Sequence, residues 1–314
     1  MSEFGFQSFP AVETVSRFPG PGSEASVPAC LESPELLCRQ KHPNGNSLIL
    51  EYMRRDYGVP ERFEDFVYVS QLLQARGVRM GIEAQRRAAP FCMGSLFWQL
   101  DDCWPALSWS CVDYFGERKA LYYHAAKAFS PELISPVVEN DTIKIFFVSD
   151  SPKSPQGALR LRLVDFDGNL LKEIEEPLPL SLPRGAPLYR IGLEALIEGH
   201  ATGAVVLVCE LQRDGGAEAR NLLYFAPPKD LILPDPGLEA KVRWTEGGGG
   251  FFVELAAERI AKDVFLSMPG CEGTFSDNFL DILPGETVTV FFKTAERPAD
   301  PGRRLRIKTL AGAR

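Results

Sequence analysis

The pattern of apolar residues changes near residue 131, and this change constrains the fold of the 314-residue chain more than any other feature. Before it, apolar residues recur at helical spacing and predict helices over 47–56, 60–88 and 119–129, the first capped by Ser47. After it, short alternating or continuous apolar runs are separated by Pro, Gly, Asp and Asn, which is typical of strands. The chain therefore combines an α/β part with an all-β part.

A short apolar run, residues 95–100, lies between the second and third predicted helices. A nearly continuous apolar run of this length predicts a strand buried on both faces, as in a parallel sheet or a barrel. Residues 19–43 are rich in Pro, Ser and Glu and show no period, so they predict a long loop.

The all-β part divides at a proline-stiffened joint, residues 226–237. We expect strands on both sides of it, at 143–148, 159–164, 204–211, 239–244, 251–255, 264–268, 287–292 and 304–309. Turn residues separate them, as at 167–169, 183–185 and 214–216. Short strands at this spacing predict immunoglobulin-like (Ig-like) β-sandwiches. The predicted domains are 1–130, 131–230 and 231–314.

The balance of charge argues against a nucleic-acid partner. The formal net charge is −8, and no cluster of Lys and Arg offers the positive face that phosphate groups require. No apolar run approaches the roughly 20 residues that a helix needs to cross a bilayer, so no membrane partner is expected. No oligomeric state follows from the sequence.

The seven cysteines are odd in number and widely spaced. They form no CxxC pair and no cluster with the three histidines at metal-ligand spacing, so neither a metal nor another cofactor is expected. This distribution favours buried free thiols over a disulfide framework, and hence a cytoplasmic location over a secreted one.

Three of the four tryptophans, Trp98, Trp104 and Trp109, fall within twelve residues that also contain Asp101 and Asp102. If the apolar run is a barrel strand, its C-terminal end delivers these side chains to the face where (β/α)₈ barrels place functional residues. Indole rings stack on the apolar faces of sugars, so tryptophan with carboxylate fits a carbohydrate pocket. The tryptophans fit packing between a barrel and a sandwich equally well.

Two long motifs resemble the β-mannosidases of glycoside hydrolase family 2. They are SEFGFQSFP at residues 2–10 and MGSLFWQLDDCWPALSWSCVDYFGERKALYY at residues 93–123. Similarities at 41–46, 63–71, 224–230 and 275–286 extend the resemblance over nearly the whole chain. The resemblance implies the last part of a (β/α)₈ TIM barrel, strands seven and eight with the following helices, and then two Ig-like β-sandwiches.

The same resemblance implies roles for individual residues. The Glu of the first motif is the family's catalytic nucleophile, at the end of barrel strand seven, and corresponds to Glu3. The second motif ends strand eight and lines the sugar pocket, which implies substrate contacts for Trp98, Gln99, Asp101, Asp102 and Trp104. Trp98 is implied as the direct sugar contact. Family members often have Asn where this chain has Asp101, so the role of that position is less defined.

Retaining hydrolysis requires a second carboxyl group as acid/base. In the family this is a Glu after barrel strand four, upstream of the nucleophile, and no residue of this chain corresponds to it. We therefore expect the chain to be a fragment of an enzyme that releases terminal β-D-mannose from oligosaccharides, and to be inactive alone.

Two alternative functions remain from the sequence. The first is another family 2 exo-glycosidase, such as a β-galactosidase, β-glucuronidase or exo-glucosaminidase. The second is a non-catalytic carbohydrate-binding β-sandwich module, for which Trp244, Phe251 and Phe252 are the candidate exposed aromatics.

Overall fold

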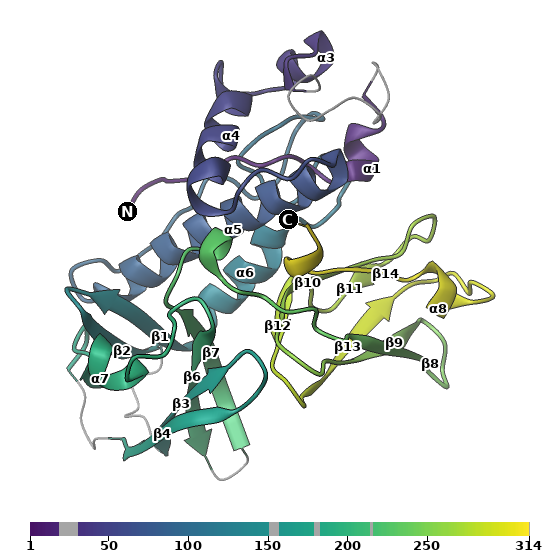
Figure 1. The fold of residues 1–314 in the computed structure, drawn as a ribbon. Helices are drawn as coiled ribbons and strands as arrows, with labels where there is room; N and C mark the ends of the chain where they lie inside the picture. Colours follow the sequence, from purple (N-terminus) through teal and green to yellow (C-terminus); the bar gives the residue numbers. More distant parts are fainter. Residues whose placement is uncertain (19–30, 151–156, 179–182, 214–215, 314) are drawn as a thin grey trace.

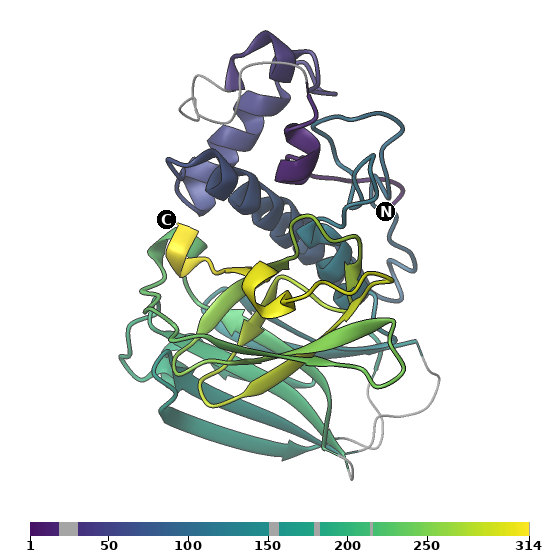
Figure 2. The same ribbon diagram turned by 90° about the vertical axis from the view of Figure 1, so that its right-hand side faces the viewer.

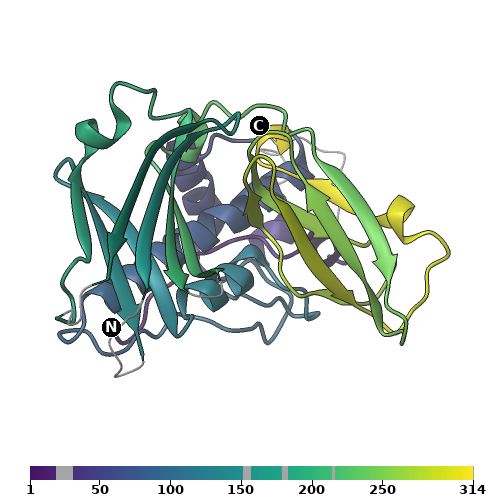
Figure 3. The same cartoon turned by 90° about the horizontal axis from the view of Figure 1, so that it is seen from below.

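The computed structural model describes residues 1–18, 31–150, 157–178, 183–213 and 216–313. One long helix, α5 (Phe63–Arg87), runs through the middle of the molecule (Figure 1). The N-terminal segments and the other helices of the first 130 residues lie above and around it, and β-structure lies below (Figure 2). Seen from below, two β-sandwiches stand side by side beneath the helices (Figure 3).

The three predicted helices are confirmed as α4 (Gly45–Asp56), α5 and α6 (Ala120–Ala128). The expected cap is wrong: Asn44 is the N-cap of α4, and the Ser47 hydroxyl instead donates to the Asn44 carbonyl. Two one-turn helices, α1 (Val12–Val15) and α3 (Pro34–Leu37), were not expected. The second interrupts the predicted loop 19–43, of which residues 19–30 lie outside the described part.

The first sandwich packs a sheet of order β1-β2-β5 against a sheet of order β4-β3-β6-β7. Its elements are β1 (Glu132–Glu139), β2 (Thr142–Ser149), β3 (Ala158–Asp165), β4 (Leu170–Pro177), β5 (Tyr189–Gly192), α7 (Leu193–Ile197), β6 (Val205–Arg213) and β7 (Gly216–Tyr224). Strand β6 is apolar along most of its length because β3 and β7 pair with its two edges and each of its faces is buried in a separate hydrophobic cluster. The predicted turn at 214–216 lies mostly outside the described residues.

The second sandwich follows a short 3₁₀ turn, η1 (Pro228–Asp230), and packs sheet β12-β10-β14 against sheet β11-β13-β9-β8. Its elements are β8 (Glu239–Trp244), β9 (Gly250–Ala256), β10 (Ala261–Ser267), β11 (Thr274–Phe275), β12 (Leu280–Ile282), β13 (Thr287–Lys293), α8 (Pro301–Arg304), β14 (Arg306–Lys308) and η2 (Ala311–Ala313). The last strand is shorter than predicted because Asp300 caps the helical turn α8.

The predicted buried strand at 95–100 is wrong. This segment forms one isolated parallel bridge, between Phe97 and Phe4, and the side chains of Leu96, Trp98 and Leu100 are 64%, 49% and 62% exposed. Residues 1–5 are its neighbour on one side, and the backbone of Gln99 and Leu100 is hydrogen-bonded to residues 109–112. The described part of residues 1–130 contains helices and isolated bridges but no sheet of a barrel.

The expectation of free thiols is confirmed for the six described cysteines. The expectation of burial holds for Cys111 and Cys209 and is wrong for Cys38 and Cys103, which lie on exposed loops. Cys30 lies outside the described residues. None of the described helices has the length and apolarity of a membrane span, and the described side chains contain no group that could hold a metal ion.

Candidate active site

Glu3 lies on an extended N-terminal segment that runs parallel to residues 95–98. The amide of Trp98 donates to the carbonyl of Phe4 over 2.7 Å, and Phe4 is bridged to Phe97. Both phenylalanines pack against the helical core. Because side chains alternate along an extended chain, Glu3 and Trp98 face the opposite, open side, where both are exposed. The structure therefore brings the predicted nucleophile and the predicted sugar contact to one face.

Gly5 allows the two segments to approach this closely. A Cβ atom at this position would lie 2.3 Å from the carbonyl oxygen of Trp98 and 2.9 Å from the Trp109 ring. Real Cβ atoms do not approach a backbone oxygen so closely, so only glycine fits here. The glycine of the SEFGFQS motif is explained by this contact.

Helix α5 supports the Glu3 segment from behind. The fully buried amide of Gln74 donates to the carbonyls of Phe6 (2.8 Å) and Ser110 (3.2 Å) and accepts from the Ser8 hydroxyl (2.7 Å). Gly77 leaves room on the helix for the Phe6 ring, because a Cβ there would lie 3.1 Å from that ring. The segment that carries Glu3 is thus fixed by both polar and apolar contacts.

Asp102 is buried, and its carboxylate is fully engaged. One oxygen pairs with the Lys41 ammonium at 2.7 Å and accepts from Gln99 at 3.3 Å. The other accepts from the hydroxyls of Ser108 (2.8 Å) and Ser110 (2.6 Å). A carboxylate with all these partners shapes the loop that follows Trp98, and it is not free to bind a sugar hydroxyl or to transfer a proton.

A buried lysine also contacts the segment that carries Glu3. Lys119, at the start of α6, is 1% exposed and donates to the Ser8 hydroxyl over 3.0 Å. Burial lowers the pKa of Lys119 to about 8, while the carboxylates of Asp102 and Asp113 oppose that shift. Ser8 therefore joins α5 and α6 to the segment that carries Glu3.

The other predicted site residues differ in what they can contact. Asp101 is exposed, and its carbonyl accepts from the Gln99 side chain at 2.7 Å. Trp104 is half-buried, with the Arg39 guanidinium 5.9 Å from its ring. The Trp98–Gln99 peptide bond is cis. Of the three tryptophans of the motif, Trp98 has the most open ring.

Sequence reasoning missed the residues that hold the site together: Lys41, Gln74, Ser108, Ser110 and Lys119. A carboxylate placed after a buried segment requires a cation, but Lys41 is 61 residues from Asp102 and no spacing rule connects them. Gln74 lies in a helix whose apolar pattern gives no reason to single it out.

Comparison with known proteins shows to which family this chain is related. Residues 141–230 match the model of a mannosidase Ig/CBM-like domain, and residues 233–313 match that of an Ig-fold domain of mannosidases. The β-mannosidase of Capra hircus is 30% identical over 93% of this chain, and β-mannosidase B of Aspergillus niger is 29% identical over 92%. The chain is homologous to the C-terminal third of β-mannosidases. It spans 35% and 36% of the length of these two relatives.

Solved structures agree with this homology. The β-D-mannosidase from Dictyoglomus thermophilum superimposes with a TM-score of 0.82 at 25% identity, covering 98% of this chain and 37% of that enzyme. An exo-chitosanase from Amycolatopsis orientalis superimposes with a TM-score of 0.65 at 21% identity over 85% of this chain and 36% of its own, which shows a shared fold. The all-β part of this β-mannosidase homologue consists of Ig-like domains.

Proposed function

We propose that this chain carries the nucleophile side of a retaining β-mannosidase active site, which releases terminal β-D-mannose from oligosaccharides. The observation that carries the proposal is the placement of Glu3 and Trp98 on one open face of two paired segments. In this arrangement Glu3 attacks the anomeric carbon of a sugar whose apolar face stacks on Trp98. Gln99, Asp101 and Trp104 line the pocket, and Asp102 holds their loop.

We further propose that residues 1–130 form the last part of a (β/α)₈ barrel and that 131–230 and 231–314 are its two Ig-like sandwiches. The parallel bridge between Phe4 and Phe97, with α5 between them in sequence, supports the barrel, because parallel neighbours joined by a helix are its repeating unit.

The acid/base is assigned to no residue of this chain. A retaining enzyme needs a second carboxyl group about 5–5.5 Å from the nucleophile. Asp102 is buried and paired with Lys41, which excludes it. The 314 residues alone are therefore expected to leave β-mannosides intact.

We infer a neutral oligosaccharide substrate, no nucleic-acid or membrane partner and no cofactor. Free thiols at the described cysteines, two of them exposed, favour a reducing cytoplasmic setting over secretion. The alternative of a carbohydrate-binding module finds less support: Phe251 is fully buried, and Trp244 packs against it with ring centroids 5.1 Å apart.

The test is a chimera in which this chain replaces the corresponding third of the Dictyoglomus thermophilum enzyme, which it matches structurally over 98% of its length. We expect the folded chimera to hydrolyse a chromogenic β-mannoside, and Glu3→Gln to lower kcat by about 10³-fold or more. Glu13→Gln, an exposed glutamate ten residues on, is the matched control and should keep full activity. Turnover by the 314 residues alone, or turnover that survives Glu3→Gln, would contradict the proposal.

A further inference from the structure

Gln99 is a predicted site residue whose side-chain orientation is fixed by its hydrogen bonds. Its Nε2 donates to the carbonyl of Asp101 over 2.7 Å and to Oδ1 of Asp102 over 3.3 Å. A primary amide carries two hydrogens on its nitrogen, so both are used. A carbonyl group and a carboxylate paired with the Lys41 ammonium can only accept, so the amide nitrogen, and not the amide oxygen, must face them.

The other end of this amide is therefore available only as an acceptor. Gln99 is half-buried, and its Oε1 accepts from no residue in the described part of the chain. The same oxygen is not among the described polar atoms that are buried without a partner, so solvent or a ligand can reach it. A group that binds to it must donate a hydrogen, as a sugar hydroxyl does.

Lys41 holds the Asp102 carboxylate where the Gln99 amide can reach it. The Asp102 side chain is 1% exposed, and the Lys41 ammonium, 2.7 Å away, neutralises its charge. The hydroxyls of Ser108 and Ser110 donate to the other carboxylate oxygen. Without Lys41 the carboxylate would be buried with its charge unpaired, which is costly, so it would move toward water. The contact with Gln99 would then be lost.

The backbone fixes Lys41 independently of any ligand. The Lys41 amide donates to the Leu107 carbonyl over 3.1 Å, and the Leu107 amide donates to the Arg39 carbonyl over 3.0 Å. This pairing joins the loop before α4 to the loop that follows Trp104. A cation that is already held in place needs little reorganisation when a substrate binds.

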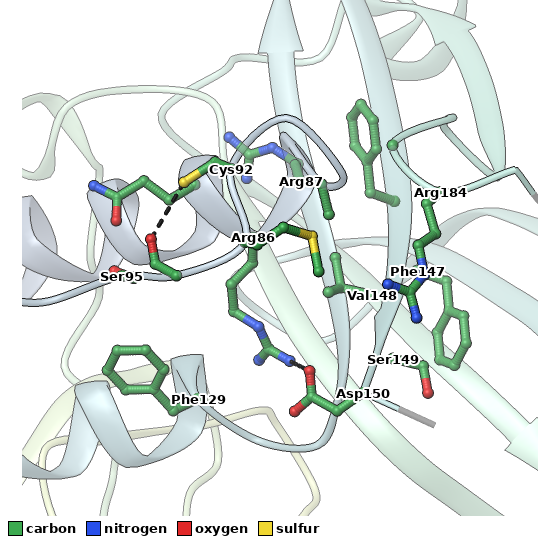
Figure 4. A pocket seen from close by; sticks show the side chains of 16 residues that line it. Arg86, Arg87, Cys92, Ser95, Phe129, Phe147, Val148, Ser149, Asp150 and Arg184 are labelled. Carbon is green, nitrogen blue, oxygen red and sulfur yellow. Dashed lines mark hydrogen bonds and ion pairs between the residues drawn. The ribbon is translucent and has the colours of Figure 1, made fainter. Parts of the chain in front are cut away.

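A cavity between the end of α5, residues 89–95 and β2 lies at the other end of the 95–100 segment (Figure 4). Neither Gln99 nor its hydrogen-bond partners line this cavity, and Arg86 on its wall is already paired with Asp150 at 3.2 Å. The Gln99 amide is thus separate from the cavity and directly follows Trp98, the proposed sugar contact.

We propose that Lys41 is a positioning residue, which acts through Asp102 to hold the Gln99 amide oxygen toward a hydroxyl group of the terminal sugar. The identity of the ligand rests on the function proposed above, whereas the orientation of the amide does not. An ion pair that is only structural makes a different prediction, because loss of Lys41 would then lower stability and leave recognition of the hydroxyl unchanged.

The first test observes the Gln99 side-chain amide by ¹⁵N NMR in the 314-residue chain, with the signal assigned by its loss in Gln99→Met. We expect hydrogen exchange at this amide to be about tenfold slower than in free glutamine, because both of its hydrogens are bonded. Lys41→Met should remove most of this protection, and Lys41→Arg, which keeps the charge, should preserve it. Lys127→Met is the matched control, because it breaks a 2.8 Å ion pair with Asp277 and should leave the Gln99 signal unchanged.

Fast exchange of the Gln99 amide in the wild type, or protection that survives Lys41→Met, overturns the positioning role of Lys41. Thermal unfolding of each variant verifies that the fold is retained. If Lys41→Met does not fold, the wild-type rate still decides whether the amide is held, and Lys41→Gln, which carries no charge, tests the contribution of the ammonium.

The second test uses the chimera described above and four aryl β-mannosides, which lack the hydroxyl at C2, C3, C4 or C6. For the parent mannoside, kcat/KM of the wild type should exceed that of Gln99→Met about tenfold, as for one lost hydrogen bond. For one of the deoxy sugars this ratio should fall to about one, because the sugar has lost the donor that Gln99 accepts from. Comparing two proteins on the same sugar cancels the intrinsic reactivity of that sugar. Lys41→Met should show the same pattern as Gln99→Met, and Lys41→Arg that of the wild type.

The outcomes separate this inference from the proposed function. If the chimera hydrolyses the parent mannoside and the ratio is the same for all four deoxy sugars, the hydroxyl contact is overturned and the proposed function stands. If the chimera does not hydrolyse the parent mannoside, the proposed function fails and the sugar contact fails with it. The exchange measurement on the 314-residue chain then still decides whether Lys41 positions Gln99.

Discussion

Gly5 is the residue at which the pairing of the two site segments can be tested most simply. Gly5→Ala would place a methyl group 2.3 Å from the Trp98 carbonyl oxygen, and the backbone would have to separate. We expect it to lower the free energy of unfolding by about 2–4 kcal/mol, as for overpacking against backbone. Gly94→Ala, where no atom lies within 4 Å, is the control and should change little. Equal urea midpoints for the two variants would show that the segments are not paired as described.

His124 provides a test of burial through pH. Burial, with nearby Arg79 and Lys127, lowers the pKa of His124 to about 3, while one ring nitrogen lies 3.2 Å from the Phe279 carbonyl oxygen. A depressed histidine pKa means that, at mildly acidic pH, the unfolded chain binds a proton that the folded chain does not bind. Stability from this residue is therefore present above pH 6.5 and is lost as the pH falls toward 3.

The expected measurement is the unfolding free energy at pH 6.5 and pH 5, for the wild type and for His124→Gln. Between pH 6.5 and pH 5, the unfolding free energy of the variant should fall by about 1–2 kcal/mol less than that of the wild type. Burial raises the pKa of Asp263 to about 6, so the contribution of Asp263 to the unfolding free energy increases as the pH falls over the same range. Both proteins contain Asp263, so the difference between them isolates the effect of the histidine. Parallel curves would mean that His124 titrates normally.

Among individual residues, the sequence motifs single out exposed residues of the candidate site, but not the buried residues that hold them in place. Glu3 and Trp98 belong to long motifs, and the structure places both on one face. The carboxylate of Asp102 appeared equivalent to that of Asp101, yet one is buried with four partners and the other is exposed. Burial of a particular carboxylate depends on which distant residues surround it, and local spacing does not contain that information.

At the scale of elements, α5 connects the site to the first sandwich through a buried polar network. Glu83 accepts from Arg79 (2.8 Å) and from the Ser135 hydroxyl (2.7 Å), and the Asn221 amide lies 3.3 Å away. The Asn221 side chain in turn donates to the Ile134 carbonyl over 2.9 Å. The C-terminal half of the helix is thereby fixed to β1 and β7.

Glu83→Ala should lower the free energy of unfolding by about 3 kcal/mol, because Arg79 loses its ion-pair partner and the buried Ser135 hydroxyl loses its acceptor. Glu64→Ala on the same helix removes an exposed pair with Arg62 (3.5 Å) and should cost less than about 1 kcal/mol. Denaturant unfolding of both variants measures the contrast. Similar losses would mean that the network does not stabilise the junction.

The three longer helices and strands such as β2, β3 and β6 were predictable from the sequence because their patterns record which face is buried, whereas β1, β4 and β7, of eight or nine residues, were not predicted. The segment 95–100 was not, because an apolar run is consistent with a buried strand only if neighbouring strands cover it. Strands β11 and β12, of two and three residues, are too short to show any period. For these segments, the conformation depends on contacts with distant parts of the chain, which a local sequence pattern does not record.

At the scale of the whole molecule, α5 is the common support of all parts. Near its N-terminus Asp65 pairs with Lys308, and the Tyr68 ring stacks on Phe279 with centroids 6.1 Å apart, which fixes the second sandwich. Its middle holds the Glu3 segment through Gln74, and its end holds the first sandwich through Glu83. The sandwiches are therefore part of the scaffold that positions the site.

The most direct measurement is covalent trapping of the nucleophile. The chimera with the Dictyoglomus thermophilum enzyme would be treated with 2-deoxy-2-fluoro-β-D-mannosyl fluoride, whose leaving group needs little acid assistance and whose fluorine slows release of the glycosyl-enzyme. We predict that peptide mass spectrometry finds one added fluoromannosyl group, on Glu3, and that Glu3→Gln removes the label while Glu13→Gln retains it. A label on any other residue, or labelling that persists in Glu3→Gln, would contradict the assignment of Glu3 as the nucleophile.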